Sequence, residues 1–294
     1  MAKQGISKYI DSLLNNSELR NDCSIIITKC DAKEYLKNVE PALESLTARY
    51  YQSTLNSAKY TGYTVDVTLF EFYSKMKDSC SQAYAILGTV LSENQIDNKT
   101  EENANYIAGN SPISDKDVID NLGIAVFNDD ILVGELSGLD SICHVIVNNE
   151  LHYCTLSIPN AKDENSPIDL AITSEKKPRY SVYFDNTGPI ISLNIYLVAH
   201  GLSLDNSINY DSQDELALIE NSASQYITEH INNYLYKTSR EYNSDICGFG
   251  KYALKHYLTL NDWYSSNWLG NYKNSKFDVH VHLKLKSGNL FDKS

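Results

Sequence analysis

The regular alternation of hydrophobic and polar residues is clearest at 190–199 and again at the end of the chain. A period of two predicts a strand with one buried and one solvated face. In the first segment the apolar face would hold Ile191, Leu193, Ile195 and Leu197. In the second it would hold Phe277, Val279, Val281, Leu283 and Leu285, with Asp278, His280, His282, Lys284 and Lys286 opposite. Both segments therefore predict strands of a sheet covered on one side only.

Residues 211–238 have a different period, with apolar positions three and four residues apart: Leu216, Ile219, Ala223, Ile227, Ile231 and Tyr234. This spacing predicts a helix of about 42 Å, at 1.5 Å per residue, long enough to pack across a whole sheet. Shorter helices are predicted at 3–15, 31–38, 41–59 and 245–258.

The remaining apolar runs predict strands. Ile25, Ile26 and Ile27 lack polar alternation, which indicates a strand covered on both faces. A hairpin is predicted at 124–136 around the turn Asn128–Asp130, and further strands at 143–147, 151–158, 167–173 and 179–184.

These elements predict a multi-domain α+β protein with mixed or antiparallel sheets, packed helices and one long helix against the C-terminal sheet. Residues 1–91 would form an α/β-like domain, 92–117 a polar linker or long loop, and 118–294 an α+β domain. The first domain looks incomplete, because one buried strand needs neighbours to satisfy its backbone groups. We expect sequence upstream of Met1 to supply them.

Charge narrows the function classes. The chain has 25 Lys and Arg against 38 Asp and Glu, a net charge of −13, without a basic run. Nucleic-acid binding depends on clustered cations, so no nucleic-acid partner is expected, and direct docking on anionic lipid is disfavoured for the same reason. Residues 1–5 lack an export signal, so either the protein is cytosolic or the chain is a piece of a longer one.

The six cysteines are Cys23, Cys30, Cys80, Cys143, Cys154 and Cys247. They form no CxxC pair and no zinc-like spacing with histidine, so structural zinc is not expected. The strand between Cys23 and Cys30 would span about 23 Å, beyond the reach of a disulfide. Most of the thiols are therefore expected to be free, in a reducing cytosol or on the exterior of an anaerobe.

Histidines offer the main catalytic candidates. His280 and His282 share a strand face and could bind a metal with a third ligand, although a solvated sheet face with Asp278 and two lysines is favoured. His144, His152 or His200 could act as a base beside Asp140, Asp205 or Ser203, but GxSxG, phosphate-loop and HExxH motifs are missing. No catalytic residue, metal or cofactor is therefore expected, and a hydrolase is kept as a third hypothesis.

The segment Cys247-Gly248-Phe249-Gly250 follows Asp245 instead of a strand and lacks the third glycine of a dinucleotide loop. Its glycines are better explained by close backbone approach between two helices. Trp263 and Trp268 are expected to anchor a core. The alternative is an aromatic-lined cleft, which would make the chain an extracytoplasmic protein that binds a small ligand.

The same region resembles the C-terminal signature of the Ger(x)C family, the C subunits of bacterial spore germinant receptors. The matching positions are Asp245, Gly248, Phe249, Gly250, Trp263, Trp268, the strand from Phe277 and Gly288. Phe127 and Gly134 lie in a stretch that resembles the hairpin opening the C-terminal domain of that family. Residues 2–5 and 19–22 resemble its N-terminal region. The family usually has a proline shortly before its first tryptophan, and residues 258–262 contain none. The conformation of this loop is therefore not given by the resemblance.

The resemblance implies a non-enzymatic lipoprotein subunit of a nutrient germinant receptor, required for spore germination. Its partners would be the A and B membrane subunits, and it would be lipid-anchored on the outer face of the spore inner membrane. Family members begin with an export signal and a lipid-modified cysteine, so the resemblance implies that Met1 begins a truncated chain. Free cysteines outside a cytosol would then indicate an anaerobic source, and the matching residues are expected to be architectural.

Overall fold

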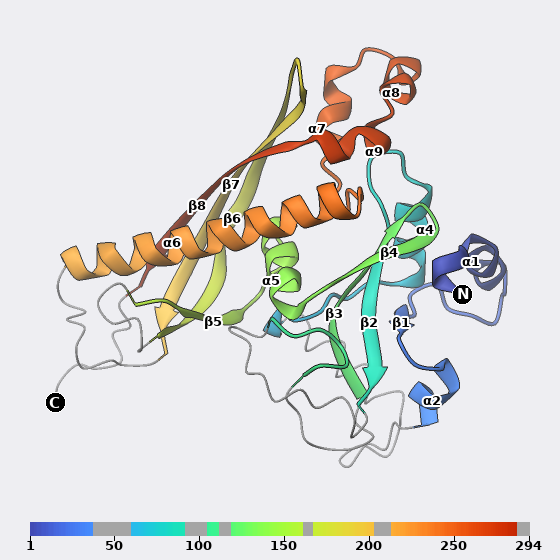
Figure 1. The fold of residues 1–294 in the computed structure, drawn as a ribbon, viewed down its shortest axis with the longest axis horizontal. Helices are drawn as coiled ribbons and strands as arrows, with labels where there is room; N and C mark the ends of the chain where they lie inside the picture. The colour runs from blue at the N-terminus through green and yellow to red at the C-terminus, as the bar shows by residue number, and fades with distance from the viewer. Residues whose placement is uncertain (38–59, 92–104, 112–118, 161–166, 203–212, 287–294) are drawn as a thin grey trace.

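The structure is a computed structural model that describes residues 1–37, 60–91, 105–111, 119–160, 167–202 and 213–286 of the 294-residue chain. The described residues contain two four-stranded sheets, which lie on opposite sides of a shared helical layer (Figure 1). The predicted helix at 41–59 lies outside the described residues, as does most of the predicted linker at 92–117.

The first sheet has the order β1-β2-β3-β4. Its strands are Ile26–Thr28, Tyr84–Val90, Ile119–Asn128 and Ile131–Leu136. β1 is parallel to β2, and the other pairs are antiparallel. Every residue of β2 is buried, as expected for a strand covered on both faces. Short helices flank this sheet, namely α1 (Ser7–Leu14), α2 (Ala32–Lys37) and α4 (Leu69–Lys77).

This sheet joins strands from both sides of the predicted linker, because β2 pairs with β3. β1 therefore finds its neighbour, β2, within the described chain. The prediction that β1 is covered on both faces was wrong: all three of its residues are only half-buried, since β1 lies at the sheet edge. The division into domains at 92–117 stays a prediction.

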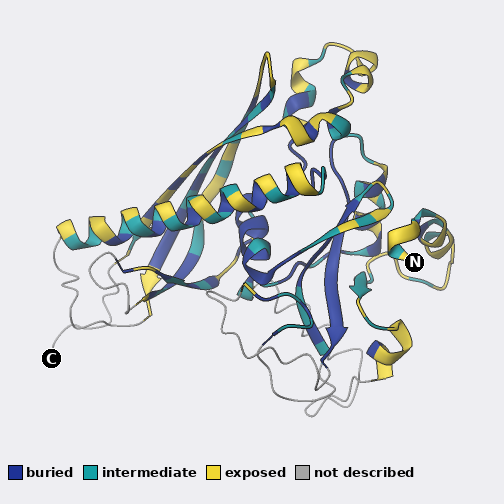
Figure 2. Ribbon diagram, in the orientation of Figure 1, coloured by how far each residue is buried: buried dark blue, intermediate teal, exposed yellow. Residues whose placement is uncertain are grey.

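The second sheet has the order β5-β6-β7-β8. Its strands are Cys154–Ile158, Ile168–Asp185, Gly188–Gly201 and Lys276–Leu285. The long helix α6 (Gln213–Tyr236) lies along one face of this sheet and turns its buried residues inward (Figure 2). The alternating patterns of β7 and β8 are confirmed, because the predicted apolar positions are the more buried ones in both strands.

Between α6 and β8 the chain forms a compact group of short helices. They are η4 (Lys237–Glu241), α7 (Gly250–Ala253), η5 (Leu254–His256), α8 (Leu260–Ser266), α9 (Trp268–Asn271) and η6 (Tyr272–Asn274). The single helix predicted at 245–258 was therefore wrong in its extent, because a hydrogen-bonded turn at Asp245 precedes α7.

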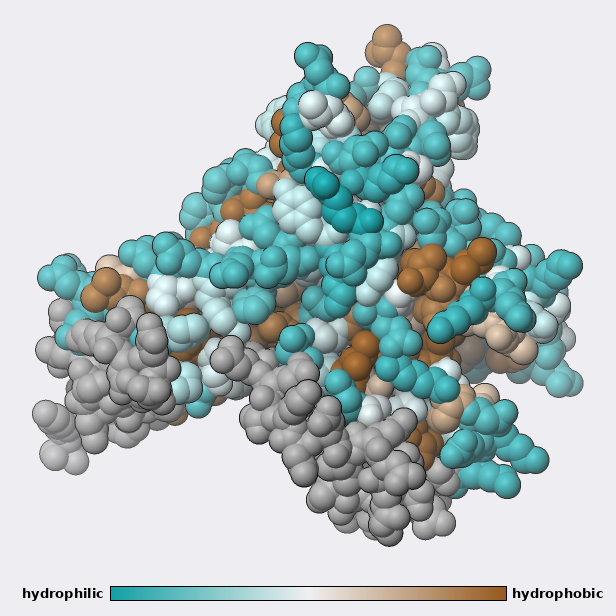
Figure 3. Space-filling view, in the orientation of Figure 1, coloured by the Kyte–Doolittle hydropathy of each residue, from teal (hydrophilic) through white to brown (hydrophobic). Residues whose placement is uncertain are grey.

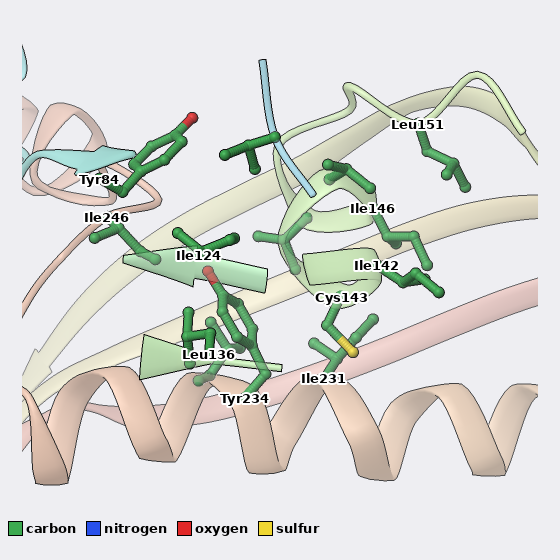
Figure 4. Close-up of a cluster of buried hydrophobic side chains, with 14 of the residues drawn as sticks. Tyr84, Ile124, Leu136, Ile142, Cys143, Ile146, Leu151, Ile231, Tyr234 and Ile246 are labelled. Carbon is green, nitrogen blue, oxygen red and sulfur yellow. The ribbon is translucent and has the colours of Figure 1, made fainter. Parts of the chain in front are cut away.

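The two sheets share one core, built around α5 (Gly138–Val147) and α6. Figure 4 shows side chains from both layers meeting there: Tyr84 and Ile124 of the first sheet, Ile142 and Ile146 of α5, and Ile231 and Tyr234 of α6. Sequence-distant segments are thus packed into one hydrophobic unit, consistent with the nearly complete burial of all six side chains.

The strand predicted at 143–147 was wrong, because those residues form the end of α5. Ser137 caps that helix by accepting from the Asp140 N–H, and the Asp140 carboxylate accepts from the Ser137 N–H, a capping box that a short apolar run does not reveal. The two strands predicted at 167–173 and 179–184 form one long strand, β6, with register shifts at 174–179. β2 was missed altogether.

The predicted α+β class with mixed sheets and packed helices is confirmed, and the described residues contain two such sheets. All six cysteines are free thiols. Over the described part of the chain, no helix combines the length and apolarity that crossing a membrane would need. The side drawn in Figure 3 is mostly hydrophilic along α6, while hydrophobic residues gather over the β3–β4 hairpin, where Ile131 and Val133 are exposed.

Candidate functional site

The segment from Tyr242 to Gly250 folds into a tight turn immediately after η4. Two residues reverse the chain in the left-handed region: Asn243 with φ 46° and Gly248 with φ 74°. Asparagine and glycine are the residues that adopt this conformation most readily. The turn brings three consecutive N–H groups, those of residues 248–250, to face the side chain of Asp245.

The Asp245 carboxylate is fully buried and accepts four hydrogen bonds. Its Oδ1 accepts from Gly248 N–H at 2.8 Å and from Phe249 N–H at 3.1 Å. Its Oδ2 accepts from Gly250 N–H and from the indole Nε1 of Trp268, both at 2.9 Å. We call Asp245, Gly248, Phe249, Gly250 and Trp268 the Asp245 node.

Burial and hydrogen bonding act on this carboxyl in opposite directions. Removal from water raises the pKa of Asp245 to about 6, while the Trp268 indole and the three backbone N–H groups pull it down. Both carboxylate oxygens of Asp245 are therefore hydrogen-bonded by groups of the protein itself.

The node connects to a distant part of the chain, residues 79–82. The backbone carbonyl of Asp245 accepts from Gln82 N–H at 2.9 Å. Gly250 packs directly on Cys80: a Cβ there would lie 2.5 Å from the Cys80 carbonyl oxygen. Trp263 Nε1 donates to Ser79 Oγ at 2.9 Å. The segment just before β2 is therefore fastened to the C-terminal helices.

The two tryptophans lie side by side. Their rings stack with centroids 6.1 Å apart and planes inclined by 25°. Tyr257 packs edge-on against Trp263, and Tyr272 packs against Trp268. Both indoles are almost fully buried, so aromatic neighbours occupy the space where the alternative hypothesis needs a ligand cleft.

The β3–β4 hairpin contacts the same turn from another side. Phe127 packs edge-on against Phe72, and its carbonyl accepts from Ser244 Oγ. Gly134 lies beneath the ring of Tyr242, so that a Cβ at this position would fall 2.3 Å from two ring carbons. The hydroxyl of Tyr242 then donates to the Glu135 carbonyl at 2.9 Å. Glycine is needed at position 134 because a neighbouring ring fills the space of a side chain.

The structure thus brings most of the predicted signature positions into one connected region. The node holds Asp245, Gly248, Phe249, Gly250 and Trp268, Trp263 stacks on it, and Phe127 and Gly134 meet the adjoining turn. Gly288 lies outside the described residues. Sequence reasoning missed Ser79 and Gln82, because their partners Trp263 and Asp245 lie more than 160 residues away in the chain.

His280 and His282 lie on the solvated face of β8, as the sequence favoured. His280 Nε2 is 3.0 Å from Asp278 Oδ1, and His282 stacks on Tyr196. Among the residues that the structure describes, no cluster of three potential metal ligands is found. The two imidazoles therefore have other partners, an acid and a ring.

His144 takes part in a buried polar network instead of an open site. Its Nδ1 lies 2.6 Å from Tyr234 Oη, its Nε2 lies 2.9 Å from Asn148 Nδ2, and Tyr234 Oη lies 3.1 Å from Cys247 Sγ. Burial lowers the pKa of His144 well below its ordinary value and raises that of Tyr234 well above its own. Both groups are neutral and have no solvent exposure, so neither of them is accessible to a substrate as a base.

His200 and His152 are the other two histidines considered as catalytic bases. His200 is exposed at the end of β7, and its predicted neighbours Ser203 and Asp205 lie outside the described residues. His152 lies near the ring of Tyr60, with centroids 6.3 Å apart.

Two family models match the chain. The one described as "Spore germination protein N-terminal domain" matches residues 1–90, and "Spore germination B3/ GerAC like, C-terminal" matches residues 122–288. The solved structure titled "Crystal Structure of the GerBC protein" has the same fold, with a TM-score of 0.65 and 11% identity over 98% of this chain and 78% of that chain. No curated protein matches the sequence.

The two matched segments and the shared fold define a spore germination protein of the α+β class. The chain belongs to the Ger(x)C family, the family of the C subunits of spore germinant receptors. The resemblance found in the sequence is therefore confirmed.

Proposed function

We propose that this chain is a non-enzymatic subunit of a nutrient germinant receptor complex and that it is required for spore germination. The observation that carries this proposal is that the polar groups of the Asp245 node are hydrogen-bonded to one another inside the fold. A carboxylate with four internal donors and two stacked, buried indoles has little left for a substrate.

We propose that the signature residues are architectural. They fasten the segment before β2 and the β3–β4 hairpin to the helices that precede β8, and so fix how the two sheets sit relative to each other. A subunit that presents a large surface to several partners benefits from such rigidity. Ordering flexible loops and side chains on binding costs free energy and so weakens the affinity.

The partners in this proposal are the A and B membrane subunits, and the place is the outer face of the spore inner membrane, with a lipid anchor. The support is the family membership, together with the net charge of −13, which disfavours direct attachment to anionic lipid.

The test is copurification from spores. The complete protein, tagged and expressed from its own locus, should bring down both membrane subunits from detergent-solubilised spore membranes and should incorporate labelled palmitate. Spores that lack it should fail to respond to nutrients and still germinate after an artificial trigger. A tagged protein that is unlipidated, cytosolic and without these subunits would contradict the proposal.

A further inference from the structure

We propose that the open edge of β8, together with the polar side of α6 beside it, binds an extended acidic segment of a partner protein as an added strand. This proposal depends on the proposed function only for the identity of the partner, which would be another subunit of the receptor. The binding surface itself is argued from the structure alone.

β8 is the last strand of its sheet among the described residues, and its other side pairs with β7 in unbroken parallel register. Lys286 N–H donates to the Ala199 carbonyl at 2.9 Å, so the even-numbered residues of β8 point their backbone groups at β7. The odd-numbered residues, among them Val279, Val281 and Leu283, therefore point theirs away from the sheet. Leu285 follows this rule, because its N–H donates outward to Glu220 Oε1 at 2.8 Å.

Strand edges of this kind are normally shielded by bulges, prolines, charged side chains, very short length or a covering helix or loop. α6 provides such cover at the Leu285 end of β8, where Glu220 accepts the outward N–H. β8 is ten residues long, carries no proline and has no register shift against β7. Strand addition requires a long, regular edge with N–H and carbonyl groups available for pairing, because the main-chain hydrogen bonds supply the affinity. Within the described part of the chain, residues 279–283 of β8 offer such an edge, whereas Leu285 N–H is already bonded to Glu220.

A groove of about 530 Å³ runs along this edge. It is lined on the β8 side by residues 279–282 and on the α6 side by Ser224, Gln225, Thr228, Glu229, Asn232 and Asn233. Two of these side chains bond back to their own helix: Thr228 Oγ1 donates to the Ser224 carbonyl, and Asn232 Nδ2 donates to the Thr228 carbonyl.

The charge of the neighbouring sheet face selects the occupant. Two cross-strand rows end at β8, the first formed by Arg179, Asn194 and His280, the second by Lys176, Tyr196 and His282. Lys176 Nζ lies 3.8 Å from the centre of the Tyr196 ring, and His282 stacks on the same ring at 5.0 Å.

Lys284 continues the basic edge one row further, where it pairs with Glu175 at 3.3 Å. The acid on β8 itself, Asp278, already contacts His280 and Ser192. In a chain with a net charge of −13, this face brings Lys176, Arg179 and Lys284 together with two histidines near a strand edge. An added strand would place alternate side chains directly beside His280, His282 and Lys284, where opposite charge is favoured across strands.

The chemistry of the occupant follows from these two faces. Side chains on one face of the added strand should be aspartate or glutamate. Those on the other face should be small, polar and uncharged, because they would meet the hydroxyl and amide groups of α6 and the carboxylate of Glu229, which disfavours a second acid there.

The experiment uses the purified chain and a decapeptide of alternating glutamate and threonine at about 1 mM, a concentration that detects weak strand addition. Hydrogen exchange of the Val279 and Val281 amides, measured by NMR, should slow at least about tenfold. A lysine–threonine decapeptide should protect much less. A glutamate–threonine peptide with prolines at alternate positions should not protect, because its backbone cannot pair.

Variants test the surface itself. Gln225→Trp should fill the groove and abolish protection, whereas Asn221→Trp, one turn away on α6 and outside the groove, should bind as the unmodified chain does. The pair His280→Glu and His282→Glu should reverse the preference toward the lysine peptide. Thermal unfolding of each variant checks that it remains folded.

The proposal is overturned if the glutamate–threonine decapeptide does not slow hydrogen exchange at the Val279 and Val281 amides, or if Gln225→Trp leaves that protection unchanged. It is also overturned if the lysine–threonine decapeptide slows exchange equally. It is also overturned if protection depends on protein concentration alone, since the occupant would then be a second copy of the chain. Copurification of the membrane subunits tests the proposed function, and peptide protection tests strand addition at β8. Because the two measurements are separate, either hypothesis can be refuted while the other is supported.

Discussion

Replacing Gly250 with alanine should damage the fold far more than the same change at Gly248, two residues earlier. An ideal Cβ at position 250 would lie 2.5 Å from the Cys80 carbonyl oxygen, 2.7 Å from Cys80 Cα and 2.8 Å from Trp268 Nε1. These atoms are backbone or a buried ring, so none can turn aside, and relief requires separating the two segments by about 1 Å.

That separation pulls two donors away from Asp245, the Gly250 N–H and the Trp268 indole, each now at 2.9 Å. Hydrogen bonds to a charged group contribute about 1.5–3 kcal/mol each, and forcing a methyl into a packed site costs about 1–3 kcal/mol. Because geometry is only partly lost, we expect Gly250→Ala to lower the free energy of unfolding by roughly 3–6 kcal/mol. Domain stabilities are about 5–15 kcal/mol, so partial unfolding at physiological temperature is expected.

Gly248→Ala is the matched control. Its Cβ would meet nothing closer than Ser81 Cβ at 3.5 Å, an ordinary contact, so the cost is only that of an alanine at φ 74°. That conformation costs about 1–2 kcal/mol for a residue with a Cβ.

Urea unfolding followed by circular dichroism gives the free energies, and tryptophan fluorescence reports the buried indoles. Should Gly250→Ala be too unstable to purify, Trp268→Phe removes one donor without adding an atom and should cost about 1.5–3 kcal/mol. Equal losses for the two glycine variants would refute the argument that contact with Cys80, and not backbone conformation, sets the requirement for glycine.

Three further variants follow from the same contacts. Gly134→Ala should cost about 2–3 kcal/mol in urea unfolding, because the methyl displaces the Tyr242 ring, and most of that cost should vanish in a Tyr242→Ala background; equal costs in both backgrounds would contradict the contact. Ser79→Ala should cost about 1–2 kcal/mol by leaving the Trp263 indole without its acceptor, and much less when Trp263 is already phenylalanine; an additive double variant would argue against the bond. Burial lowers the pKa of His144, so below about pH 6.5 the unfolded chain binds a proton that the folded chain does not. The free energy of unfolding, relative to that of His144→Gln, should therefore fall by about 1.4 kcal/mol per pH unit below about pH 6.5. Parallel pH dependences of the two free energies would contradict a neutral imidazole.

The elements with a strong period were available from the sequence. Strand β7, strand β8 and the long helix α6 have regular apolar spacing, which depends only on local geometry and on having one face buried. The signature positions were also visible, because glycine, aspartate and tryptophan in fixed order are distinctive as letters, and the family they indicated is the one to which the chain belongs.

Short apolar runs were not decided by the sequence. The run at 143–147 has no period long enough to separate a strand from a helix, and it became helical because Ser137 and Asp140 cap α5 and its whole surface is buried between the sheets. Likewise β2 has no alternation, since both of its faces are covered.

The contacts that join the C-terminal helices to residues 79–80 belong wholly to the tertiary structure, whereas the turn around Asp245 is local. Nothing near Gly250 in the chain indicates that Cys80 will lie against it, and nothing near Trp263 points to Ser79. Sequence spacing determines which residues share a face of one element, because that geometry is local. Which two elements meet is determined by how a single core can be filled, and that depends on every side chain at once.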